Sequence, residues 1–385
     1  MENPECEVLN SEFGVIIASA VNFLQLSIIN EELSIITMHP LEKEILAVLR
    51  AEGLVSSGES VVAGVSGGPD SMALLHVFAA LAPIIGIKII AVYVNHQLRP
   101  VEAEKEGCLV EQQARSLGAS FVTCRIDVKG EAGKRKISIE HAARELRYDF
   151  FVRVAGKFLA EKIAVAHTAD DQAEEVLLRL IRGTGRTGLS GMKMMRDGRI
   201  IRPFLTTAKE QLLAYLDERH IPFLTDSSNL ERQYLRNRVR LDLIPYLRGF
   251  NPNISETLRQ TATVLQDEEM VLAALTDKYW EQMATILPGN LEEALPVVAV
   301  DLAGFLSLER AIQRRIAEKV FISLGSQPQF KKIEQILHVA AAGETGARLH
   351  FSRGLRMKKG REHLVFSYPE GKIARRGNLD DVWLG

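Results

Sequence analysis

The chain has 385 residues, a formal net charge of −2 and three cysteines. This length predicts two or three domains with ample chain for a large core. The near-zero charge excludes a protein that attracts nucleic acid through a global positive field, so any basic surface must be local. The cysteines, Cys6, Cys108 and Cys124, form no C-x-x-C pair. A disulfide framework or a thiolate metal site is therefore not expected, which fits a reducing, cytoplasmic compartment.

The first segment of the chain is apolar between residues 14 and 29. The stretch is short, contains Asn22 and Gln25, and lacks the basic region that opens an export signal, so no membrane role is expected. Orderly patterning begins just after Met38. Residues 1–37 are predicted to be a leader, and two alternatives stay open: the leader is disordered, or translation starts at Met38 and the leader is not made.

From residue 41 to residue 182, short apolar runs alternate with stretches of helical periodicity. Buried strands are predicted at residues 60–65, 88–94, 121–128 and 163–166. Helices are predicted at residues 41–54, 71–81, 102–117, 138–158 and 170–182. This alternation is typical of an α/β fold with a doubly wound, Rossmann-like parallel sheet. In such sheets ligands bind beyond the carboxyl ends of the strands.

The pattern changes after Pro245, and residues 249–253 are a cluster of helix breakers. Beyond them, helices are predicted at residues 254–286, 308–324 and 329–341, followed by a short β element at residues 348–367. We therefore predict a first domain at residues 38–250 and a smaller, mostly helical domain at residues 251–385.

The first predicted strand and the next helix are joined by the loop Ser66-Gly67-Gly68-Pro69-Asp70-Ser71. Unpaired amides and the positive dipole end of a helix N-terminus hold phosphate well, and glycine lets the backbone approach the anion closely. Asp70 could ligate a Mg²⁺ bound to the phosphates. No lysine follows the loop, so it is not a Walker motif. The alternative is a glycine turn in which Asp70 only caps the helix.

Further polar residues follow predicted strands or lie on predicted helices. They are His96 and Arg99 after the second strand, Arg144 and Arg147 on one helix face, His167 after the fourth strand, and Asp171 and Glu174 on one face of the following helix. Two carboxylates beside a phosphate loop are electrostatically costly unless a cation joins them, and a substrate ammonium group would be such a cation. The alternatives are solvated charges and, for the acidic residues, stabilisation of the helix N-terminus.

The loop resembles the S-G-G-x-D-S loop of the PP-loop, or N-type, ATP pyrophosphatases. That resemblance implies cleavage of ATP between its α- and β-phosphates. Together with the segments 202–204, 226–229 and 236–240, the motifs resemble the tRNA(Ile)-lysidine synthetase family, in the family's order from about residue 61 to residue 252. Members attach free L-lysine to the cytidine at the first anticodon position of an isoleucine tRNA. The chain departs from the family pattern at Glu175, where threonine is common, and is short for the extra C-terminal domain of longer members.

The resemblance implies roles for individual residues. ATP binding is expected of Ser66, Gly67, Gly68, Pro69, Asp70, Ser71, His96, Arg99 and His167, with Asp70 at the Mg²⁺ ion. Lysine binding is expected of Arg147, Asp171 and Glu174, which with Asp70 form the expected catalytic set. Contact with tRNA(Ile) is expected of Arg144, Arg236, Arg238 and Arg240, and of the second domain. A homodimer is a further possibility that the sequence leaves open.

Two other functions remain as alternatives. One is tRNA thiolation on the same fold, which commonly uses paired cysteines that this spacing does not provide. The other is a non-catalytic module that senses nucleotide or binds tRNA and has kept only the fold.

Overall fold

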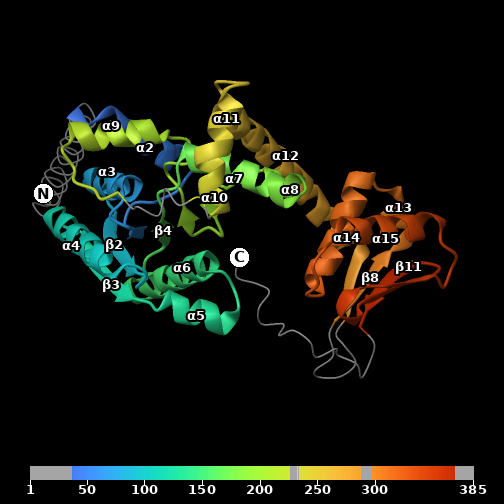
Figure 1. The fold of residues 1–385 in the computed structure, drawn as a ribbon. Helices are drawn as coiled ribbons and strands as arrows, with labels where there is room; N and C mark the ends of the chain where they lie inside the picture. Colours follow the sequence, from blue (N-terminus) through green and yellow to red (C-terminus); the bar gives the residue numbers. More distant parts are fainter. Residues whose placement is uncertain (1–36, 226–231, 233, 288–295, 369–385) are drawn as a thin grey trace, which may run out of the picture. The chain divides into compact units, whose positions relative to one another are not determined.

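The computed structural model describes residues 37–225, 232, 234–287 and 296–368. The chain divides into two compact units between Ala262 and Thr263 (Figure 1). This division falls inside the long helix α12 (Ile254–Met283), later than the predicted boundary at residue 250, and the domain limits stay a prediction. The predicted leader lies outside the described residues, apart from Thr37. Among the described residues, the helices are too short or too polar for any of them to span a bilayer.

The first unit is built on a six-stranded sheet with the order β3-β2-β1-β4-β6-β5. Its strands are β1 (Ser60–Gly64), β2 (Lys88–Asn95), β3 (Ser120–Arg125), β4 (Lys162–Ala164), β5 (Met195–Arg196) and β6 (Ile200–Ile201). All neighbours are parallel except β5, which runs antiparallel to β6. From β1, the chain adds β2 and β3 on one side of the sheet and then β4 and β6 on the other. The strand order therefore reverses between β1 and β4. The predicted α/β class and parallel sheet are confirmed.

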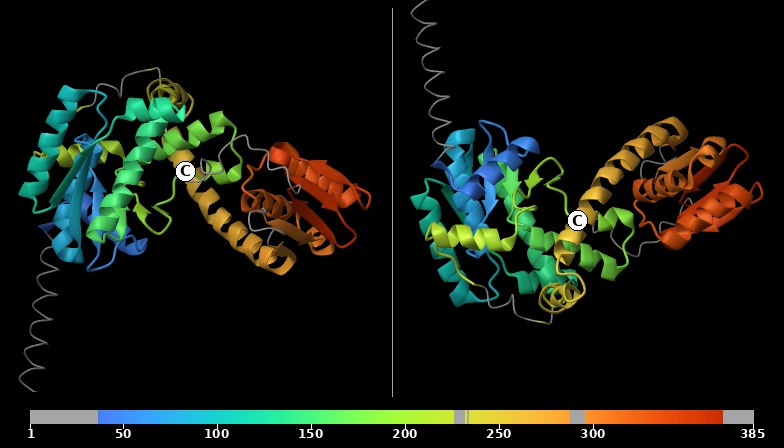
Figure 2. Two further views of the ribbon diagram at one scale, coloured as in Figure 1. Left: turned by 90° about the horizontal axis from the view of Figure 1, so that it is seen from below. Right: turned by 90° about the horizontal axis from the view of Figure 1, so that it is seen from above.

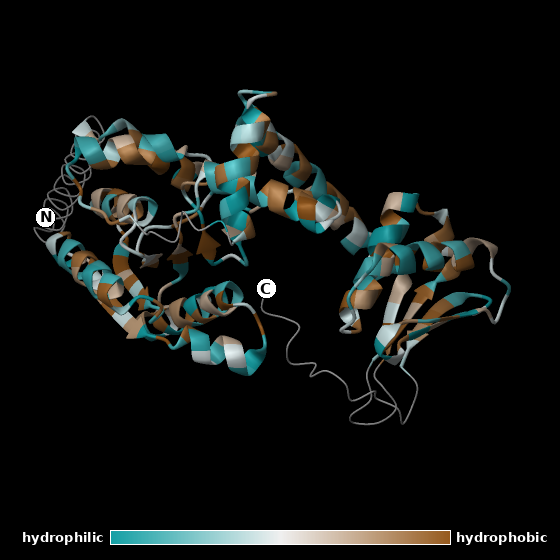
Figure 3. Ribbon diagram, in the orientation of Figure 1, coloured by the Kyte–Doolittle hydropathy of each residue, from teal (hydrophilic) through white to brown (hydrophobic). Residues whose placement is uncertain are grey.

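Helices cover both faces of this sheet, as Figure 2 shows. One face packs on α2 (Pro40–Ala51), α3 (Pro69–Ile85), α4 (Pro100–Ser116) and α9 (Lys209–Glu218), and the other on α6 (Ile139–Phe158). Val61 of β1 points into the first core and Val62 into the second. Both faces of the strand are therefore buried, which explains the continuous apolar run in the sequence. Figure 3 shows hydrophobic colour on these strands and mostly hydrophilic colour on the outer helix α5 (Val128–Arg135).

Gly64 lets α6 pack closely on the end of β1. A Cβ atom at this position would lie 2.6 Å from Cζ of Phe151. That separation is far below van der Waals contact, so any larger side chain would push β1 and α6 apart. The absence of a side chain at Gly64 therefore fixes the spacing between α6 and the strand that leads into the phosphate loop.

Several short elements were not predicted. The third strand ends at Arg125 and not at residue 128, because Asp127 caps α5 and accepts a hydrogen bond from the Gly130 amide at 2.9 Å. The two-residue strands β5 and β6 and the helix α9 lie in a region for which no element was predicted. The two strands are too short to show a period.

The first unit ends in a helical segment that packs on α7 (Ala169–Arg182). The segment consists of α10 (Leu235–Arg238), a π-helical turn (Val239–Leu243) and α11 (Ile244–Arg248). Val239 and Ile244 pack there against Leu177 and Leu178 of α7. The contact brings the arginines of α10 and the π turn to the acidic face of α7.

The second unit combines helices with a five-stranded antiparallel sheet of order β7-β8-β11-β10-β9. Its strands are β7 (Ala284–Leu287), β8 (Val297–Asp301), β9 (Arg348–His350), β10 (Arg356–Lys359) and β11 (His363–Ser367), and its helices α13 (Leu302–Ser307), α14 (Arg310–Ser323) and α15 (Phe330–Ala342). The core includes Trp280, Phe321 and Phe366. The expected helical domain with a β element is confirmed, and β7 and β8 make the sheet larger than predicted. The helix predicted to reach residue 286 ends at Met283, where β7 follows.

Candidate active site

Buried polar atoms without a hydrogen-bond partner gather at the carboxyl edge of the first sheet. Within the described part of the chain, these atoms include Oδ1 of Asp70, Nδ1 of His96, Nδ1 of His167 and Nε of Arg202. The four residues follow β1, β2, β4 and β6. A buried polar atom without a partner costs free energy, so such atoms are rare in native proteins unless a ligand or water satisfies them. Their coincidence marks this edge, where the strand order reverses, as the ligand site.

The loop after β1 is held in place by its own serines. Oγ of Ser71 accepts a hydrogen bond from the Ser66 amide at 3.0 Å and donates to the Gly68 carbonyl at 2.9 Å. Gly67 has a φ of 82°, in the region that favours glycine. Gly68 caps α3 without a side-chain hydrogen bond, and Pro69 follows as the first helical residue. The loop is thus fixed while the first amides of α3 stay available for an anion.

Asp70, in the first turn of α3, contacts a lysine from a distant part of the chain. Nζ of Lys209 lies 3.2 Å from Oδ2 of Asp70. Burial raises the pKa of Asp70, and Lys209 beside it offsets part of that rise. Since Oδ1 is buried and unpartnered, the carboxylate still has one oxygen free for a cation. Groups of three or more potential metal ligands are absent from the described residues, so a cation here would need further oxygens from a substrate.

The acidic face of α7 is covered by two arginines. Nε of Arg236 lies 3.0 Å from Oε2 of Glu174, and Nε of Arg240 lies 2.5 Å from Oε1 of the same carboxylate. Both guanidinium groups also lie 3.1 Å from Oδ1 of Asp171. The side chain of Glu174 is 2% exposed. A pair of carboxylates this deeply buried needs cations in contact, and Arg236 and Arg240 supply them.

Asp171 also serves the helix itself. Its Oδ2 accepts a hydrogen bond from the Thr168 amide at 2.9 Å, and the Thr168 hydroxyl in turn accepts from the Asp171 amide. This is a capping box at the start of α7. One oxygen of Asp171 therefore caps the helix while the other faces the arginines. The structural alternative holds, and a role in binding a substrate stays a prediction.

The pKa values of the two carboxyl groups shift in opposite directions in this environment. Burial alone would raise the pKa of Asp171, but Arg236, His167 and Arg240 lower it below its ordinary value. Burial raises the pKa of Glu174, and the two arginines offset only part of that rise. Of the pair, Glu174 is thus the one that more readily accepts a proton.

Two histidines and Arg202 also lie at this edge of the sheet. Burial, with a smaller contribution from Arg147, lowers the pKa of His96 to about 4. Burial also lowers the pKa of His167 to about 3, although Asp171 opposes the change. Both imidazoles are therefore neutral at physiological pH and can donate or accept hydrogen bonds. Arg202, 3% exposed, donates to the Lys193 carbonyl at 2.7 Å but keeps its Nε without a partner.

The comparisons with known proteins agree with this geometry. A family model described as a PP-loop domain matches residues 38–247. The tRNA(Ile)-lysidine synthase of Bacillus subtilis (strain 168) is 32% identical over 337 residues, which cover 85% of the chain and 70% of that protein. The corresponding protein of Clostridium tetani (strain Massachusetts / E88) is 38% identical over 305 residues, 78% of the chain and 64% of that protein.

The chain belongs to the tRNA(Ile)-lysidine synthase family. This confirms the resemblance seen in the motifs. The chain spans about two thirds of the lengths of these two synthases. Among solved structures, the U34-tRNA thiolase NcsA from Methanococcus maripaludis matches with 16% identity and a TM-score of 0.47, over 58% of the chain and 78% of that protein. A likeness this weak supports no argument.

Not all the residues expected to act in a lysidine synthase lie together. The loop residues, His96, His167, Asp171 and Glu174 share the carboxyl edge. Arg99 instead lies 3.0 Å from Glu102 on α4. Arg144 and Arg147 are exposed on α6 but lie within electrostatic range of the site, since Arg147 helps to lower the pKa of His96 and Arg144 that of His167. These assignments stay predictions.

The arginines expected at tRNA separate into two groups. Arg236 and Arg240 point inward to the acidic face, whereas Arg238 between them is exposed. Residues four apart share a helical face and the intermediate one does not. Glu175, the departure from the family pattern, pairs with Arg179 at 2.7 Å and lies 3.8 Å from Arg236.

Sequence reasoning missed two residues of the site. Lys209 begins a helix that was not predicted, and its contact with Asp70 bridges distant parts of the chain. Arg202 was noted only as part of a family segment, because β6, the two-residue strand that it follows, shows no period in the sequence.

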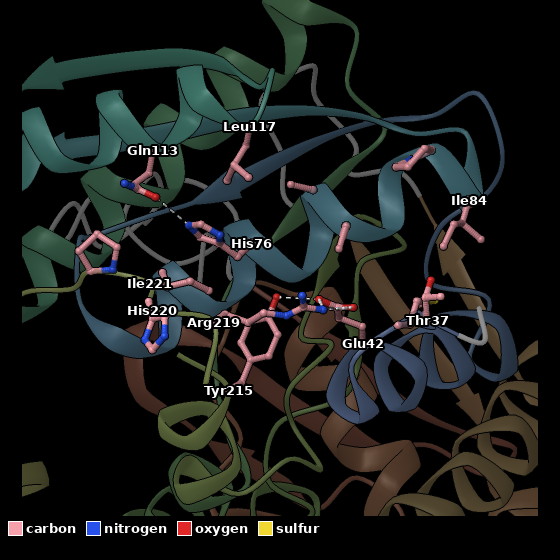
Figure 4. A pocket seen from close by; sticks show the side chains of 15 residues that line it. Thr37, Glu42, His76, Ile84, Gln113, Leu117, Tyr215, Arg219, His220 and Ile221 are labelled. Atoms are coloured by element: carbon pink, nitrogen blue, oxygen red, sulfur yellow. Dashed lines mark hydrogen bonds and ion pairs between the residues drawn. The ribbon is translucent and has the colours of Figure 1, made fainter. Parts of the chain in front are cut away.

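A separate cavity of about 950 Å³ opens among α2, α3, α4 and α9 (Figure 4). The carboxylate of Glu42 accepts hydrogen bonds there from the Tyr215 hydroxyl at 3.0 Å and from Arg219 at 3.1 Å. His76 and Gln113 are also linked, at 3.0 Å. None of the predicted site residues lines the cavity, and its hydrogen bonds join α2 to α9 and α3 to α4.

Proposed function

We propose that the chain ligates free L-lysine to C2 of cytidine 34 in tRNA(Ile) with the anticodon CAU, using ATP and releasing AMP and pyrophosphate. Family membership supports the reaction class. The observation that carries the proposal is the buried pair of carboxylates, Asp171 and Glu174, at the same edge of the sheet as the phosphate loop. Such a pair suits a substrate that brings an ammonium group to an ATP site.

The first step would be adenylation of the cytidine. O2 of the base attacks the α-phosphorus of ATP and pyrophosphate leaves, which turns a poor leaving group into a good one. The amides at the start of α3 and the serine hydroxyls of the loop hold the phosphates. Asp70 would hold a Mg²⁺ ion, which neutralises phosphate charge and typically keeps one or two carboxylate ligands beside phosphate oxygens. The neutral imidazoles of His96 and His167 can hydrogen-bond the nucleotide or the base.

The second step would be attack by the ε-amine of lysine on C2, with departure of AMP. The ammonium groups of lysine compete with Arg236 and Arg240 for Asp171 and Glu174. The amine must lose a proton before it attacks, and its ordinary pKa is about 10.4. We propose Glu174, whose pKa burial raises, as the acceptor of that proton. Arg147 is proposed to contact the lysine carboxylate.

The proposal is tested by lysine-dependent release of AMP with an unmodified tRNA(Ile) transcript. Wild-type chain should release AMP only when lysine, ATP and the transcript are all present, and mass spectrometry should find lysidine at position 34. Asp70→Asn should reduce turnover at least about a hundredfold, since it removes a ligand of the phosphate-bound cation. AMP release that does not depend on lysine would contradict the proposal.

The thiolation alternative is less supported. Cys124 is part of β3, and burial raises the pKa of its thiol to about 11, which leaves little thiolate at neutral pH. Cys108 is exposed on α4. A thiolation enzyme would need a sulfur donor in the transcript assay, and a nucleotide sensor would release no AMP.

The remaining expectations concern partners and location. Phosphate contacts to tRNA are proposed for Arg144 and Arg238, whose side chains are exposed, and for the second unit, with affinity that falls as salt rises. For Arg236 and Arg240, tRNA contact would require them to leave the acidic face. The cytoplasm is proposed on the sequence alone, and a homodimer stays a possibility that the sequence leaves open.

A further inference from the structure

The contact between Lys209 and Asp70 has no part in the reaction as described above. Lys209 is the first residue of α9, and its amide donates to Oδ2 of Asp170 at 2.9 Å. Its backbone is thereby fixed to the start of α7. Its side chain extends to the phosphate loop, where Nζ lies 3.2 Å from Oδ2 of Asp70. Helix α9 thus delivers an ammonium group to the loop after β1.

The contact does not have the properties of a purely structural ion pair. The side chains of Lys209 and Asp70 are 34% and 25% exposed, and ion pairs this open contribute little to stability. Lys209 also satisfies only one oxygen of Asp70, since Oδ1 is buried and without a partner. A flexible ammonium group with solvent access can exchange one anion for another.

The loop itself lacks a cation for the phosphates that lie beyond the α-phosphate. Residues 66–71 contain no lysine or arginine, whereas Walker loops carry their own lysine. Pyrophosphate carries several negative charges, which the amides of one helix terminus neutralise only in part. Lys209 places a cation in direct contact with the carboxylate of this loop.

We propose that Lys209 is a pyrophosphate-binding residue. Without a bound polyphosphate, its ammonium group pairs with Asp70. When a magnesium-bound polyphosphate binds, the ammonium group leaves the carboxylate and contacts the β- and γ-phosphates, which become the pyrophosphate product. The inference rests on the proposed function to the extent that the loop must use ATP. It adds a residue, from an element outside the loop, that holds the leaving group.

The test is calorimetric titration of the full-length chain with sodium pyrophosphate in excess MgCl₂, without tRNA or lysine. Lys209→Met should weaken pyrophosphate binding at least about tenfold, because a charge-assisted contact is lost. Lys209→Arg keeps the charge and should stay within about threefold of wild type. The matched control is Lys157→Met, an exposed lysine near the C-terminal end of α6, which should leave the affinity unchanged.

Thermal unfolding followed by circular dichroism checks that each variant is folded. Should Lys209→Met fail to fold, Lys209→Gln takes its place with the same expected weakening. A folded, uncharged variant that binds pyrophosphate within about twofold of wild type would overturn the inference. An equal loss of pyrophosphate affinity in Lys157→Met would also overturn the inference.

The two proposals can fail separately. If wild-type chain forms no lysidine but binds pyrophosphate through Lys209, the proposed function falls and this inference stands. If lysidine is formed and the affinity for pyrophosphate is unchanged in Lys209→Met, only this inference falls.

Discussion

The guanidinium of Arg236 lies 3.0 Å from the carboxylate of Glu174, which is almost completely buried. Arg236 comes from α10, at the end of the first unit, and Glu174 from α7, more than sixty positions earlier. The pair therefore links the segment of α10 and α11 to the acidic face of α7. Arg236, Arg240, Asp171 and Glu174 form one network, and a change in any member will be felt by the others.

Arg236→Ala should destabilise the fold by about 2 kcal/mol. Removing one partner of a buried ion pair costs about 3–5 kcal/mol, and here Arg240 still covers the carboxylates. Arg238→Ala, an exposed neighbour on the same short helix, is the control and should change stability by less than about 0.5 kcal/mol. Urea unfolding of both variants measures the difference, and equal effects would show that the network does not contribute to stability.

Glu174→Gln should raise the KM for lysine at least about tenfold, because one charge-assisted contact to an ammonium group is lost. The KM for ATP should stay within about twofold of wild type. Glu111→Gln is the matched control, since Glu111 pairs with Arg115 on α4 and has no contact with Arg236 or Arg240 among the ion pairs of the described residues. A lysine KM that is unchanged in Glu174→Gln would remove this residue from the lysine site.

His167→Gln should make stability less dependent on pH between about 6.5 and 4. The pKa of His167 is about 3 in the folded chain, against an ordinary 6.5. Below pH 6.5 the unfolded chain takes up this proton and the folded chain does not, so wild-type stability falls as pH falls through this range. Urea midpoints of the wild type and the variant are measured at pH 7, 6 and 5. The midpoint of the wild type relative to that of the variant should fall steadily as the pH is lowered. Parallel curves would contradict the buried neutral imidazole.

Gly64→Ala should destabilise the first unit by about 2 kcal/mol, because the new Cβ would overlap the ring of Phe151. In a Phe151→Leu background the penalty should shrink, since the two residues are in contact. Gly156→Ala on α6, where nothing lies within 4 Å of the added atom, is the control and should be neutral or stabilising. Additive effects of Gly64→Ala and Phe151→Leu would contradict the contact.

The parallel strands could be predicted from the sequence because each is a fully buried apolar run, as at Val61 and Val62. The strands β5 and β6 could not, since two residues show no period, and β7 could not because it follows α12 without a break. The loop at Ser66 and the acidic face at Asp171 are local patterns and could be located. Their partners could not, because Arg236, Arg240 and Lys209 meet them through tertiary packing that no local pattern records.

The double use of Asp171 separates two residues that look equivalent in the sequence. Its Oδ2 closes the capping box of α7, and its Oδ1 meets two guanidinium groups. Glu174 accepts its hydrogen bonds from the side chains of Arg236 and Arg240. If an Asp171 variant lost activity, the loss could come from a disturbed start of α7 or from an altered substrate contact, and the two causes could not be separated. Glu174 is the position at which recognition can be altered without disturbing the cap that begins the helix.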